Sequence, residues 1–113
     1  MIHKMNLAPW AYDAIGSGKK TVEMRLYDEK RAKIKIGDEI EFENRETHEK
    51  LTCKVKNISR YKDFFELYDS FDKIVLGYSE NEEANAEDIY SFYSKEEIEK
   101  YGVLAIEIEV IFN

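Results

Sequence analysis

The sequence has few of the residues that build a disulfide framework, a metal centre or a flexible linker. It contains one cysteine, one proline and five glycines among 113 residues. A single cysteine excludes an intramolecular disulfide and a zinc site built from several thiolates. The two histidines, His3 and His48, are far apart in the chain, so a histidine-based metal site is not expected. We therefore predict no metal and no cofactor.

Long apolar runs and an excess of positive charge are also missing. No run approaches the roughly 20 apolar residues of a membrane-spanning helix, and the N-terminus lacks the apolar region of a signal peptide. The expectation is a cytoplasmic protein with no membrane partner. The formal net charge is −7, which disfavours binding of duplex DNA through its phosphates.

Positive charge is nonetheless concentrated in one part of the chain. Seven basic residues fall within 17 positions: Lys19, Lys20, Arg25, Lys30, Arg31, Lys33 and Lys35. Acidic residues dominate later, between positions 80 and 99. One side of the domain could therefore attract an anion, although such a run is also compatible with a solvated loop and strand face.

Length and periodicity predict one domain that covers residues 1–113. Alternating apolar positions predict strands at 3–7, 21–26, 39–43, 51–58 and 103–112. Helices are predicted from Pro9, after an N-cap at Asp63, and from a Ser94 capping box to about Tyr101, with a short turn or helix over 88–93. Five to six mostly antiparallel strands with short helices inserted indicate an α+β fold, a small β-barrel.

The most informative segment is the charged strand that follows the first helix. Strict alternation places Glu23 and Arg25 on one strand face and Val22 and Met24 on the other, with Lys20 at the strand entrance. Charges on one face are typical of a solvated strand. Alternatively, Lys20, Glu23 and Arg25 line a polar cleft, where they would shift one another's pKa values and hold a planar polar ligand.

Three short patterns in order along the chain resemble the ASCH domain, a family of the PUA-like superfamily of small β-barrels. They are Gly18-x-Lys20-x-x-Glu23-x-Arg25, the turn Lys35-x-Gly37-Asp38, and Tyr101-Gly102-Val103 before a long strand. The similarity extends from about Leu7 to Phe112. It implies a cleft beside the first helix that binds RNA or a nucleotide, with Tyr93, Ser94 and Tyr101 closing it from the other side.

One branch of this family consists of small amidohydrolases that remove the acyl group from N4-acetylcytidine. The resemblance implies that their catalytic lysine corresponds to Lys20. In that branch a threonine stands where this chain has Glu23. A second catalytic carboxylate would fall, by region only, near Glu87 or Asp88.

Two mechanisms and one simpler alternative are consistent with these residues. In a binding module, Lys20 and Arg25 would contact phosphate or a base edge and Glu23 would accept from a base amino group. Trp10 or Tyr27 would stack on the base. In a metal-independent amidohydrolase acting on a modified nucleoside, Lys20 and Glu23 would be catalytic and Arg25 would stabilise the oxyanion. The third alternative is a protein-interaction domain that uses its acidic 80–99 segment.

Overall fold

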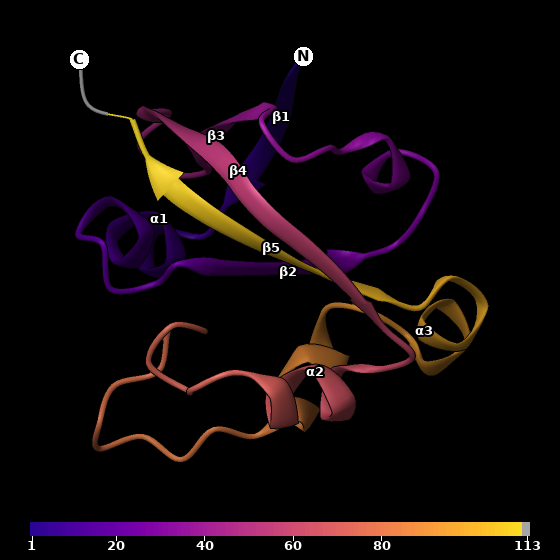
Figure 1. The fold of residues 1–113 in the computed structure, drawn as a ribbon. Coiled ribbons are helices and arrows are strands. Elements are labelled where there is room, and N and C mark those ends of the chain that lie inside the picture. The colour runs from indigo at the N-terminus through magenta and orange to yellow at the C-terminus, as the bar shows by residue number, and fades with distance from the viewer. Residues whose placement is uncertain (112–113) are drawn as a thin grey trace.

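The computed structural model describes residues 1–111, which form one five-stranded sheet curled into a half-barrel (Figure 1). The strands are β1 (Ile2–Leu7), β2 (Val22–Leu26), β3 (Glu39–Asn44), β4 (Lys50–Tyr61) and β5 (Val103–Val110). They lie in the order β1-β3-β4-β5-β2, so β1 and β2 form the two edges. The β1–β3 pair is parallel and the other neighbouring pairs are antiparallel. The predicted α+β fold is confirmed.

The three α-helices begin where local sequence signals indicate, whereas one 3-10 helix was not predicted and the other begins two residues before its predicted start. The α-helices are α1 (Pro9–Gly16), α2 (Phe64–Ser70) and α3 (Lys95–Tyr101), and the 3-10 helices are η1 (Arg31–Lys33) and η2 (Ala86–Ser91). Pro9 occupies the first turn of α1, where its missing N–H is not needed. The Asp63 side chain accepts from the backbone N–H of Glu66, and Ser94 forms the predicted capping box with Glu97.

Two strands differ from their predicted bounds by more than one residue. The β3–β4 hairpin is present, but β4 continues past position 58 to Tyr61, with a register shift between Val55 and Asn57 where it crosses β5. Such an irregularity bends a strand and increases its twist, which lets one long strand follow the curvature of the sheet. The last strand ends at Val110, and the predicted terminus at Phe112 lies outside the described residues.

Two apolar clusters lie on the two sides of the sheet, and β5 contributes to both of them. The first cluster fills the half-barrel and consists of Met5, Leu7, Ala11, Ile15, Ile34, Ile40, Phe42, Cys53, Val55, Leu104, Ile106 and Ile108. The second joins β2 and β5 to the helices and consists of Val22, Met24, Leu26, Phe64, Leu67, Leu76, Ala86, Ile98, Val103 and Ala105. Figure 1 shows α2 and the segment after it on the opposite side of β2 and β5 from β1 and β3. The prediction of a single apolar face for the last strand is therefore wrong, because Val103 and Ala105 are buried against the helical layer.

Two kinds of feature are absent from residues 1–111. None of their helices combines the length and the apolar character needed to cross a membrane. No group of three histidine, cysteine, aspartate or glutamate side chains among them is placed to hold a metal ion.

Candidate functional site

Lys20, Glu23 and Arg25, called the charged array below, meet at the gap between the two edge strands. The chain leaves α1 through Gly18, which has a φ of 84°, a conformation that favours glycine. The backbone N–H groups of Lys19 and Lys20 both donate to the carbonyl oxygen of Ala14, which closes this turn. Lys20 is therefore fixed two positions before Val22, the first residue of β2.

The side chain of Lys20 is almost completely buried and makes two hydrogen bonds and one ion pair. Its Nζ donates to the carbonyl oxygens of Val22 and Leu76, each at 2.9 Å, and lies 3.5 Å from Oε1 of Glu23. Three acceptors match the three N–H donors of an ammonium group. Strict strand alternation predicted that Lys20 and Glu23 point to opposite faces. This does not hold, because Lys20 precedes β2 and its side chain turns toward Glu23.

Glu23 is shared between the two cations. Its Oε1 accepts from the backbone N–H of Met24 at 3.1 Å, and its Oε2 accepts from Nε and Nη2 of Arg25 at 3.2 and 2.9 Å. Nη2 of Arg25 also donates to the carbonyl oxygen of Asn6 in β1 at 2.9 Å. Arg25 thus bridges the two edges of the sheet, which are not paired with each other.

The buried environment shifts the pKa of each member of the array. Burial lowers the pKa of Lys20, and the charge of Glu23 opposes this only in part. Burial alone would raise the pKa of Glu23, but the charges of Lys20 and Arg25 outweigh it and hold that pKa below its usual value. Burial alone would lower the pKa of Arg25, but the Glu23 carboxylate holds it above the usual value. Glu23 is therefore ionised at neutral pH, and the array carries a net positive charge while Lys20 is protonated.

The array lies at the bottom of a cavity of about 140 Å³, which we call the motif cavity. Its other lining residues are Asn6, Leu7, Ala8, Trp10, Ala11, Met24, Arg45, Ile89, Phe92 and Tyr93. A larger cavity of about 410 Å³, which we call the aromatic cavity, adjoins the motif cavity. The two cavities share four lining residues, Trp10, Met24, Ile89 and Phe92. The two cavities together form a cleft between α1 and η2.

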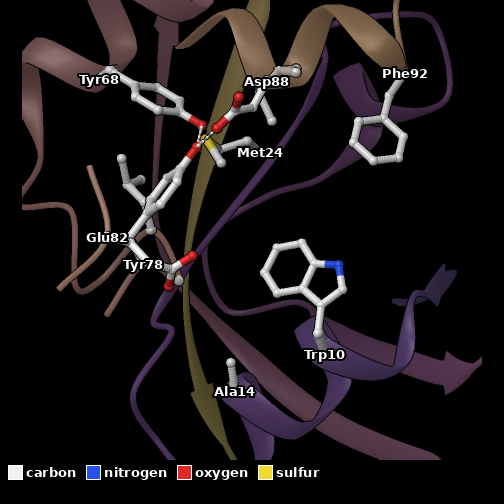
Figure 2. A pocket seen from close by; sticks show the side chains of 11 residues that line it. Trp10, Ala14, Met24, Tyr68, Tyr78, Glu82, Asp88 and Phe92 are labelled. Atoms are coloured by element: carbon white, nitrogen blue, oxygen red, sulfur yellow. Dashed lines mark hydrogen bonds between the residues drawn. The ribbon is translucent and has the colours of Figure 1, made fainter. Parts of the chain in front are cut away.

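Figure 2 shows the aromatic cavity with the ring of Trp10 projecting from α1 and the ring of Phe92 near the chain that carries Asp88. Both rings are largely solvent-exposed, Trp10 at 57% and Phe92 at 63%. On the opposite wall, the hydroxyls of Tyr68 and Tyr78 lie 2.8 Å apart. The Tyr78 hydroxyl lies 3.1 Å from Oδ2 of Asp88, to which it donates. The cleft therefore has a cationic end and an end rich in hydroxyl and carboxylate groups.

The structure brings five of the eight predicted ligand-contacting residues to the motif cavity: Trp10, Lys20, Glu23, Arg25 and Tyr93. Of the two regional candidates for a second carboxylate, Asp88 lines the aromatic cavity, whereas Glu87 is exposed in the first turn of η2. Whether any of these residues binds a ligand stays a prediction.

The three other predicted residues lie elsewhere. Tyr27 lines a separate cavity, with the Arg60 guanidinium carbon 3.7 Å from its ring centroid, so one face of its ring is already covered. Ser94 is occupied in the capping box of α3. Tyr101 packs against the second apolar cluster, with Nζ of Lys100 5.0 Å from its ring centroid.

Sequence reasoning did not find Asn6, Arg45, Phe92, Tyr68 or Tyr78 as parts of the cleft. Asn6 lies in β1, and Arg45 lies in the turn after β3, the strand with which β1 pairs although it is remote in sequence. The backbone N–H of Arg45 donates to the carbonyl oxygen of Leu7, which brings Arg45 to the cleft. Phe92 follows η2 in a stretch predicted only as an apolar turn. Local periodicity carries no signal for these positions.

Comparisons with known proteins concern the whole chain. The sequence profile of the ASCH domain matches residues 5–112. A crystal structure of a hypothetical protein shares 38% identity over 98% of this chain and 100% of that chain, with a TM-score of 0.83. A solution NMR structure of a protein from Pyrococcus furiosus shares 37% identity over all of both chains, with a TM-score of 0.71.

A more distant structure is that of ASCH from Zymomonas mobilis, with 18% identity over 96% of this chain and 66% of that chain and a TM-score of 0.64. At this identity the likeness concerns the fold. No curated protein matches the chain.

Proposed function

The chain belongs to the ASCH domain family, and we propose that it binds a nucleotide or a single-stranded RNA element in the motif cavity. The observation that carries the proposal is a buried, positively charged array beneath two exposed aromatic rings. Cationic donors suit phosphate oxygens and base edges, and exposed aromatic rings suit the faces of unstacked bases.

The charged array contributes mainly a positive electrostatic potential, because most of its hydrogen-bond donors already have partners within the protein. Glu23 and Lys20 already have their partners within the protein. Nη1 of Arg25 carries no hydrogen bond to any of residues 1–111, and within the same range Arg45 makes no ion pair. These two guanidinium groups are therefore the donors that the proposal assigns to a phosphate or a base edge.

Trp10 and Phe92 supply the stacking surface. An exposed aromatic ring beside a cavity can stack on the face of a base. Such stacking contributes about 1–3 kcal/mol of binding free energy per base. The acidic overall charge favours a small nucleotide or a short segment over a long polyanion, because few phosphates can be neutralised outside this cleft.

Trp10 is the only tryptophan in the sequence, so its fluorescence reports on this cleft alone. We expect nucleoside monophosphates or short single-stranded RNA to quench it saturably. Calorimetry should show that Trp10→Ala weakens binding by about tenfold or more, since 1.4 kcal/mol corresponds to a factor of ten. Phe65→Ala removes another exposed ring, one that stacks on Tyr90 away from the cleft, and serves as the matched control.

Equal losses in the two variants, or no quenching by any nucleotide or RNA tested, would contradict the assignment. Melting curves of both variants must be recorded alongside, so that a folding defect is not mistaken for a binding defect.

A second candidate function is a metal-independent amidohydrolase that acts on a modified nucleoside such as N4-acetylcytidine. The observation that favours it is the buried Lys20 beside Glu23, because burial lowers the pKa of a catalytic lysine toward the working range of a base. Against it, all three donors of the ammonium group are engaged, so proton transfer would require one of these contacts to break.

Incubation with N4-acetylcytidine and chromatography of released cytidine separate the two functions. Turnover that disappears in Lys20→Met would favour the hydrolase. Binding without turnover would favour the binding module.

A further inference from the structure

We propose a second ligand site, for a phosphate-class oxyanion, in a cavity of about 360 Å³ formed where η1 faces the end of β4. Its lining residues are Tyr27, Arg31, Ala32, Ile34, Ile58, Ser59, Arg60 and Leu104, and we call it the arginine cavity. This site does not depend on the function proposed for the motif cavity.

Two residues that line the arginine cavity each carry a buried side-chain polar atom with no hydrogen-bond partner within residues 1–111. The two atoms are Nε of Arg31 and Oγ of Ser59, which come from η1 and β4 respectively. These are the unsatisfied buried side-chain nitrogen and oxygen atoms of the described part of the chain, and the residues that carry them both line this one cavity. Buried polar groups are nearly always paired, so two that share a cavity indicate a shared polar partner.

The geometry of Arg31 specifies the kind of partner. Its Nη1 donates to Oδ2 of Asp28 at 2.6 Å, and Oδ1 of the same carboxylate accepts from the backbone N–H of Arg31. Asp28 thereby holds the guanidinium by one nitrogen. The opposite edge, made of Nε and Nη2, presents two parallel N–H donors, the fork that binds two oxygens of a phosphate or carboxylate group.

The positive charge of Arg60 and the hydroxyl group of Ser59 also favour an anion as the ligand of this cavity. Asp28 offsets the charge of Arg31, but Arg60 adds a second positive charge and makes no ion pair within residues 1–111. Arg60 is held over the ring of Tyr27 at 3.7 Å, so its guanidinium is fixed at the cavity wall. The Ser59 hydroxyl can donate to the same anion. Donors from three positions suit the tetrahedral oxygens of a phosphate group better than the two coplanar oxygens of a carboxylate.

Two sources of this chemistry are compatible with the position of the cavity: free phosphate and the phosphodiester of a single-stranded RNA. Arg25 lines the motif cavity and Tyr27, two residues later in the chain, lines the arginine cavity, so the same short segment reaches both cavities. A strand bound in the cleft could therefore extend toward the arginine cavity. The experiment below distinguishes the two sources.

The test follows the Nε–Hε resonances of the arginines by two-dimensional 1H–15N NMR at constant ionic strength. The probes are inorganic phosphate and a short single-stranded RNA without a terminal phosphate. We expect a saturable shift of the Arg31 resonance with at least one probe. Arg31→Lys keeps the charge but removes the fork, and Ser59→Ala removes the hydroxyl. Each of the two substitutions should raise the dissociation constant of the probe about tenfold, as measured from the chemical-shift change of the Arg60 Nε–Hε resonance.

Lys33→Ala is the matched control, since it removes a charge from the same 3-10 turn without removing a donor from the cavity. We expect it to weaken binding by less than about twofold. A shift with phosphate alone identifies a free-phosphate site, and a shift with RNA identifies a phosphodiester site. No shift with either probe, or a larger effect of Lys33→Ala than of Arg31→Lys, would overturn the proposal.

Discussion

Replacing Lys20 with methionine should destabilise the fold strongly, because the ammonium group connects three parts of the structure. Methionine keeps most of the buried volume but removes the donor to Val22 and Leu76 and the partner of Glu23. Removal of one partner from a buried ion pair costs about 3–5 kcal/mol. Arg25 still neutralises Glu23 in the variant, so we expect the lower end, about 3 kcal/mol.

A loss of about 3 kcal/mol is a large share of the roughly 5–15 kcal/mol that stabilise a typical domain. For a chain of this size it corresponds to a fall in melting temperature of about 12 °C. Urea denaturation followed by circular dichroism measures it directly, with an unchanged dependence on urea concentration if both proteins unfold in one step. Lys19→Met is the matched control, because Lys19 is exposed and should change stability by less than about 0.5 kcal/mol.

A double-mutant cycle with Glu23→Gln tests whether the ion pair is the cause. Glu23 and Lys20 should show a coupling free energy of at least about 1 kcal/mol, since the loss of one partner removes most of the benefit of the other. A loss below about 1 kcal/mol in Lys20→Met, or additive effects in the double variant, would refute the reasoning.

Two further predictions concern the same array. Burial raises the pKa of Glu23, but Lys20 and Arg25 bring it below its ordinary value of 4.5. The stability that this carboxylate contributes is therefore present above pH 4.5 and lost as the pH falls through the folded pKa, so Glu23→Gln should flatten the acid side of a melting-temperature profile. Gly77 has a φ of 110°, and an added Cβ would lie 3.2 Å from side-chain atoms of both Lys20 and Trp10. Gly77→Ala should cost more free energy of unfolding than Gly37→Ala, whose φ is 94° with open space around it; equal losses in urea denaturation would contradict this.

Much of the fold was predictable because its signals are local. The N-cap at Asp63, the Ser94 capping box and the hairpin between β3 and β4 each depend on residues a few positions apart. The same holds for the charged array, whose three members lie within six positions and meet through one turn and one strand. Local geometry was sufficient there.

The rest of the site required long-range information. The burial of Val103 and Ala105 depends on a helical layer formed by residues from position 64 onward, which no strand periodicity reveals. Tyr27 was predicted to stack on a ligand, yet it follows β2 and its ring lies under Arg60 from β4. Phe92 reaches the cleft only because η2 and the residue after it lie across the cavity from α1. The position of each of these side chains depends on contacts between segments that are remote in the sequence.

The position of the array at the sheet opening bears on why these charges are buried at all. Well-packed apolar residues of similar volume often match or exceed the stability of a buried ion array, so stability alone does not account for three charged side chains here. Backbone hydrogen bonds between the edge strands β1 and β2 would close the opening of the sheet. Instead, the Arg25 side chain spans this opening with one hydrogen bond to the carbonyl oxygen of Asn6. This arrangement keeps a cavity open and maintains a positive potential inside it. An apolar closure would provide neither, which is the physical argument for a polar, anionic or nucleotide-like ligand at this opening.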